Sequence, residues 1–124
     1  MDKAEFQKLV EEGVEMIPEE FLKKLKNVAI VIEDSPSDEQ RKKTNVSKES
    51  LLLGLYEGVP QTKRGANYGL VLPDKITIFQ KQIEQIAHSA EKIRAVVRDT
   101  VWHEIAHHFG SGEKGAVKAA RRLK

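Results

Sequence analysis

We predict that this chain folds into a single α+β domain, and three observations lead to that prediction. Its 124 residues lie within the usual size range of one domain. A share of 40% hydrophobic and 32% charged residues is typical of a globular protein. Apolar residues recur at helical spacing near both ends of the chain, whereas the middle contains short β-branched segments. We therefore expect residues 1–124 to form one domain.

The N-terminal region has the pattern of two amphipathic helices. From Lys3 to Met16 apolar residues recur at helical spacing, and Asp2 is available as an N-cap. Pro18 interrupts this pattern and is expected in the first turn of a short second helix. The apolar face of that second helix would consist of Phe21, Leu22 and Leu25.

Three segments in the middle of the chain have the character of strands. Val28–Ile32 is short and β-branched, which predicts a buried strand and the central one of the three. The polar stretch over residues 33–50 predicts a surface loop, with a turn of helix near Asp38–Lys42. The other strands are expected at Leu51–Tyr56 and Lys75–Gln80, with a loop over Gly58–Gly69 between them.

Helical periodicity returns after Gln80. A first helix would contain Ile83, Ile86 and Ala87, and a stronger pattern runs from about Glu91 to Phe109, where Gly110 ends it. A last short helix is expected over Lys114–Leu123. The residues of the longer helix that should face the core are Ile93, Val96, Val97, Val101, Ile105 and Phe109.

Composition narrows the range of functions. Because the chain has no cysteine, imidazoles and carboxylates are the candidate metal ligands. The apolar stretches are far shorter than the roughly 18 residues of a membrane span, and the N-terminus lacks a signal-peptide pattern, so we expect a cytoplasmic protein. A net charge of +2 is too small to indicate a nucleic-acid partner. The oligomeric state is open, with a monomer as the default.

The strongest chemical signal is the pattern HExxH, which lies within a segment that periodicity alone predicts to be helical. Residues four apart share a helix face, so the imidazoles of His103 and His107 can converge on one tetrahedral Zn²⁺ ion. Glu104 would lie beside the metal and act as general base toward a zinc-activated water. A hydrolytic site needs a third ligand, and the turn at Gly110 makes Glu113 the candidate.

Three segments upstream of this helix extend the pattern. They are Leu55-Tyr56-Glu57-Gly58-Val59-Pro60, Arg64-Gly65 and Leu72-Pro73-Asp74-Lys75-Ile76-Thr77-Ile78-Phe79. Together with HEIAHHFG they resemble the family of minimal bacterial zincin-like metallopeptidases over roughly Leu51–Glu113. The resemblance implies a short mixed sheet packed on helices, with the HExxH motif on a core helix. In that family the position of Glu113 is usually aspartate, as it is in snapalysin-type enzymes.

The resemblance also suggests where a substrate would bind. It implies that Lys75–Gln80 is an edge strand above the metal helix, to which an extended peptide adds by backbone hydrogen bonds. Tyr68, in the preceding loop, would offer a hydroxyl group to a tetrahedral intermediate.

Neighbouring residues have simpler interpretations. His108 should point about 100° away from His107, toward the surface or an outer shell of the site, and His88 should be a surface residue. Trp102 is expected in the core. Asp99 would either accept a proton from a ligand imidazole or pair with a nearby Arg or Lys.

We therefore expect a zinc metallopeptidase that hydrolyses peptide bonds of a peptide or protein substrate, with Glu104 as the base and with the ligands His103, His107 and Glu113. Two alternatives stay open. The chain could be a catalytically inactive zincin-like domain that binds a peptide or protein partner. The weaker alternative is a nucleic-acid-associated module that uses the basic tail over Lys114–Lys124.

Overall fold

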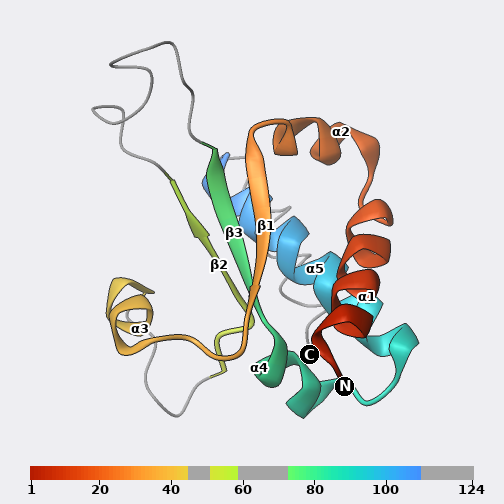
Figure 1. The fold of residues 1–124 in the computed structure, drawn as a ribbon. Coiled ribbons are helices and arrows are strands. Elements are labelled where there is room, and N and C mark those ends of the chain that lie inside the picture. The colour runs from red at the N-terminus through yellow and green to blue at the C-terminus, as the bar shows by residue number, and fades with distance from the viewer. Residues whose placement is uncertain (45–50, 59–72, 110–124) are drawn as a thin grey trace.

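The fold is α+β, as predicted, and Figure 1 shows its helices around a small sheet. This computed structural model describes residues 1–44, 51–58 and 73–109. Within these ranges the elements are α1 (Lys3–Glu15), α2 (Glu19–Leu22), the 3-10 helix η1 (Lys23–Leu25), β1 (Val28–Glu33), α3 (Asp38–Thr44), β2 (Gly54–Glu57), β3 (Asp74–Phe79), α4 (Gln80–Ile86) and α5 (Ala90–His108). No helix in the described ranges is both long and apolar enough to cross a membrane.

The sheet is mixed and has the order β1-β3-β2. The central strand β3 pairs in parallel with β1 and antiparallel with β2. Within the described part of the chain two predictions were therefore wrong: Val28–Ile32 lies at an edge of the sheet, and Lys75–Gln80 is not an edge strand. The apolar character of β1 does not reflect two covered faces, because Val31 is 39% exposed. In β3, by contrast, the polar Thr77 is fully buried in the central strand.

Several predicted boundaries shift by a few residues. β2 begins at Gly54 rather than Leu51, and Gln80 opens α4 instead of closing the strand. The predicted turn of helix in the polar stretch is the complete helix α3. The rest of the predicted loop after Gly58 and the last helix over Lys114–Leu123 lie outside the described residues.

Local capping explains where the helices begin. As predicted, Asp2 caps α1, because its Oδ1 accepts a hydrogen bond from the Glu5 amide at 2.8 Å. α3 begins with a capping box: the Gln40 amide donates to Ser37 Oγ at 3.1 Å, and the Ser37 amide donates to Gln40 Oε1 at 2.8 Å. Pro18 is the N-cap of α2 and therefore precedes its first turn.

The hydrophobic core lies between the sheet and the pair α1 and α5. Helix α5 runs behind the sheet in Figure 1, and α1 lies beside it. Gly13 permits a close approach of these helices, because a Cβ atom there would lie 2.7 Å from the Arg94 carbonyl oxygen. Phe109, predicted to face the core, is instead 41% exposed because it follows the last turn of α5. The fully buried side chains of the core include Phe6, Ile76, Ile78, Ile83, Val97, Val101 and Ile105.

Candidate metal and catalytic site

The last turns of α5 present the HExxH residues on a helix that extends to His108. The rings of His103 and His107 are neighbours, with centroids 5.4 Å apart and planes at 80°. This is the arrangement expected for residues one helical turn apart. The structure thus brings the two predicted imidazole ligands side by side.

Two buried residues fix the rotation of this part of α5. Val101 and Ile105 are fully buried and lie one turn apart on the core-facing side. His103 follows Val101 by two positions, which turns it about 200° around the helix axis and away from the core. Packing of the apolar side therefore aims the histidines out of the core.

The histidines line a cavity of about 630 Å³ between the end of α5, strand β2 and the end of α3. This volume lies within the range of small-molecule and peptide pockets. The cavity is lined by Thr44, Leu52, Gly54, Leu55, Tyr56, His103, Glu104, His107 and His108. The structure therefore brings Glu104 and both predicted imidazole ligands into one cleft, next to an outer strand of the sheet.

Glu104 lies in this cleft and is half-buried. Its Oε1 accepts a hydrogen bond from the backbone amide of Tyr56 at 2.9 Å. Burial raises the pKa of the Glu104 carboxyl, and the Tyr56 hydrogen bond and the neighbouring imidazoles oppose that rise. A carboxylate with a raised pKa holds a proton more readily, which suits a general base.

Tyr56 links three elements around the cleft, and the sequence did not single it out. Its hydroxyl group donates to Asp74 Oδ2 at 2.5 Å. The His108 ring stacks on the Tyr56 ring with centroids 3.8 Å apart and planes at 14°, and His108 Nε2 lies 4.0 Å from Asp74 Oδ2. His108, predicted to lie at the surface or in an outer shell, is partly exposed and also lines the cleft.

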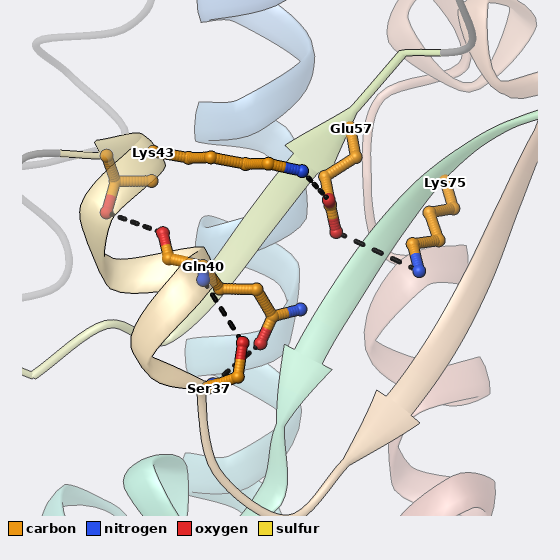
Figure 2. A network of polar contacts seen from close by, with 6 residues as sticks. Ser37, Gln40, Lys43, Glu57 and Lys75 are labelled. Atoms are coloured by element: carbon orange, nitrogen blue, oxygen red, sulfur yellow. Dashed lines mark hydrogen bonds and ion pairs between the residues drawn. The ribbon is translucent and has the colours of Figure 1, made fainter.

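A polar network on the other face of β2 joins this strand to α3. Lys43 Nζ lies 3.2 Å from Glu57 Oε2, and Lys75 Nζ lies 3.8 Å from Glu57 Oε1 (Figure 2). Successive strand residues point to opposite faces, so Tyr56 contacts α5 while Glu57 contacts α3. This network holds the end of α3, where Thr44 forms part of the cleft wall.

The described residues supply part of a zinc site. They contain no group of three or more His, Cys, Asp or Glu residues placed to hold a metal ion. His103 and His107 provide two adjacent imidazoles, which are ligands that Zn²⁺ prefers. The predicted third ligand Glu113 lies outside the described residues, as does Tyr68. The two described imidazoles fit a zinc ion in their chemistry.

Other residues that the sequence singled out have separate places. Asp99 is 2% exposed, and Arg98 Nε donates to its Oδ1 at 2.8 Å, so it has the predicted basic partner but is buried. That Asp99 accepts a proton from a ligand imidazole stays a prediction. Trp102 packs against the core, with its ring centroid 5.4 Å from that of Phe21. His88 is exposed, as predicted, in the connection between α4 and α5.

A protein-family model described as zincin-like metallopeptidase matches residues 25–118. Among solved structures, the chain is similar to a conserved hypothetical protein from T. thermophilus, with 27% sequence identity and a TM-score of 0.54. That match covers 86% of this chain and 92% of the other. A search of curated proteins found no match.

Proposed function

The chain belongs to the zincin-like metallopeptidase family, and on that premise we propose that it is a zinc-dependent peptidase with Glu104 as its general base. One observation carries the proposal: a half-buried carboxyl group, whose pKa burial raises, lies beside two adjacent imidazoles at the wall of a cleft. A helix used only for packing would have no need of that combination. We propose His103, His107 and Glu113 as the zinc ligands.

Each part of the site has a separate task in this proposal. A zinc ion held there would supply a Lewis acid that polarises a substrate carbonyl and makes water more acidic. Glu104 takes a proton from the attacking water and later delivers it to the leaving amine. The raised pKa of Glu104 favours its holding that proton between the two events. The Tyr56 amide keeps Oε1 of Glu104 in one position meanwhile.

The sheet order favours β2 as the strand that a substrate joins, because β2 pairs with β3 on one side only among the described residues. The Phe79 amide donates to the Leu53 carbonyl at 3.0 Å, so every second residue after Leu53 also faces β3. Gly54 and Tyr56 therefore direct their backbone groups toward the cleft. Because Glu104 occupies the Tyr56 amide, an extended peptide would pair beside Gly54.

The test combines metal analysis with peptide hydrolysis. We expect about one zinc per chain in the wild type, since zincin sites hold a single metal ion, and less zinc in Glu113→Ala. Glu104→Gln should keep its zinc and lose hydrolysis of a mixed peptide library. His88→Ala, which removes an exposed histidine away from the cleft, is the matched control and should change neither quantity.

Two results would contradict the proposal. Equal hydrolysis by the wild type and Glu104→Gln would remove the general base from the mechanism. Bound zinc without any hydrolysis would favour the alternative, a zincin-like domain that binds a peptide or protein partner without cleaving it.

A further inference from the structure

Strand β2 is short, and the side chain of Tyr56 anchors it to the centre of the sheet. Tyr56 lies opposite Ile76, and Asp74 precedes Ile76 by two positions on the same face. The hydroxyl group of Tyr56 reaches this diagonal neighbour, as long aromatic side chains can. Asp74 is itself held firmly, because it is only 7% exposed and its amide donates to the Asn27 carbonyl at 3.1 Å.

Tyr56 also contacts α5 at two points. Its backbone amide donates to Glu104 Oε1, and its ring stacks on His108 one helical turn later. This amide donates to Glu104 Oε1 at 2.9 Å and so gives the carboxylate a fixed backbone partner. The position of the Glu104 carboxylate therefore depends on where the Tyr56 backbone lies.

We propose that Tyr56 and Asp74 are positioning residues for Glu104. The hydrogen bond from the Tyr56 hydroxyl to Asp74 sets the place of the β2 backbone, and the Tyr56 amide then sets the place of the Glu104 carboxylate. Asp74 thus acts on the base without touching it. The catalytic consequence rests on the proposed function, because it requires Glu104 to be the base, whereas the positioning itself does not.

The Glu104 side chain has several rotatable bonds. Loss of the hydrogen bond from the Tyr56 amide therefore gives the carboxylate many alternative positions. A misplacement of about 1 Å can lower a catalytic rate about a hundredfold. We expect this effect in kcat rather than KM, because the affected group acts in the chemical step.

The first measurement needs no activity and uses the metal-free protein. The Tyr56 amide proton resonance is recorded by NMR for the wild type, and Glu104→Ala supplies the value for complete loss of the hydrogen bond. We expect Asp74→Ala to move this resonance toward the Glu104→Ala value. Asp74→Asn keeps an oxygen that accepts from the Tyr56 hydroxyl, so it should stay near the wild type.

Glu57→Gln is the matched control for this measurement. It changes the next residue of β2, whose side chain lies on the opposite face and contacts Lys43 and Lys75. We expect it to leave the Tyr56 amide resonance in place. A resonance that does not move in Asp74→Ala, or that moves equally in Asp74→Asn and Asp74→Ala, would overturn the positioning role.

The second measurement uses the zinc-loaded protein. Asp74→Ala should keep its zinc and lose about ten- to a hundredfold in kcat with KM changed less than about twofold. Asp74→Asn should recover most of that loss. A wild type that hydrolyses peptides and an Asp74→Ala variant with the same kcat would overturn the catalytic consequence. If the wild type hydrolyses nothing, the proposed function fails, and the amide resonance still decides whether Asp74 positions Glu104.

Discussion

The two halves of α5 differ in what surrounds them. In Ala90–Val101 the buried residues Ile93 and Val97 pack against α1 and the sheet. In Trp102–His108 the buried stripe continues through Ile105, but the side chains away from the core line the cleft. One continuous apolar stripe therefore sets the rotation of the whole helix. Both halves contribute buried side chains to the core, and in the second half this packing also orients the polar residues that line the cleft.

The largest expected effect is on zinc affinity, and it should follow from replacing a cleft residue in the second half of α5. This replacement should affect metal binding alone. We expect His107→Ala to lower zinc affinity by more than about a hundredfold, since even residues that only orient ligands contribute up to about that much. The metal-free stability should change by less than about 0.5 kcal/mol, because His107 is exposed. Zinc titration and urea unfolding of the metal-free protein measure the two quantities. Unchanged zinc affinity would contradict the proposal that the cleft residues in the second half of α5 bind the metal.

Shortening a buried side chain in the second half of α5 should instead lower the free energy of unfolding. Ile105 is fully buried, so Ile105→Ala removes buried methyl groups and leaves a cavity. We expect a loss of about 2–5 kcal/mol in the free energy of unfolding, measured by urea denaturation without metal. A loss below about 1 kcal/mol, the level of a conservative core change such as Ile to Val, would mean that the stripe does not hold this part of α5.

The contact between α1 and the first half of α5 should be sensitive to a single added methyl group. In Gly13→Ala the new Cβ would lie 2.7 Å from the Arg94 carbonyl oxygen and 3.2 Å from Val97. Alanine favours helix by about 1 kcal/mol over glycine, yet we expect a net loss of about 1–3 kcal/mol from overpacking. Thermal and urea unfolding measure it, with the exposed Lys8→Ala on the same helix as control. A more stable Gly13→Ala variant would show that the helices can separate at little cost.

The smallest expected effect separates the charge of Glu104 from its hydrogen bond. Glu104→Gln keeps an oxygen acceptor for the Tyr56 amide and removes a charge that burial disfavours. Its metal-free stability should equal or slightly exceed that of the wild type. Glu104→Ala leaves the Tyr56 amide without this acceptor and should lose about 1 kcal/mol. Urea unfolding of both variants tests this, and equal stabilities would contradict it.

The sequence predicted the helices well because their signals are local. The cap at Asp2 and the limits of α5 follow from residues within one or two turns of each helix end. Strand order depends instead on contacts between distant segments. Val28–Ile32 is uniformly apolar and yet lies at an edge, while Asp74–Phe79 includes polar residues and lies at the centre. Apolar content alone therefore could not show which strand is central and which lies at an edge.

The candidate site likewise contains residues that local sequence signals predict and residues whose contacts depend on distant segments. His103, Glu104 and His107 lie within about one helical turn of each other, so their spacing predicted that they lie close together at one cleft. Tyr56 lies 48 residues before Glu104, and its contact with that residue depends on the register of two strands. One local signal was present: Tyr56 carries a polar group at the end of a predicted strand, and Asp74 directly precedes another predicted strand. Without the register, that signal could not be assigned to a partner.

The bond between Glu104 and the Tyr56 amide has a further consequence for self-association. An outer strand with open backbone groups is a template on which another molecule can add a strand and begin an aggregate. At Tyr56 an intruding strand must first displace a carboxylate, which is a stronger acceptor than a neutral carbonyl. Glu104 would thereby also limit the length of chain that can pair with β2.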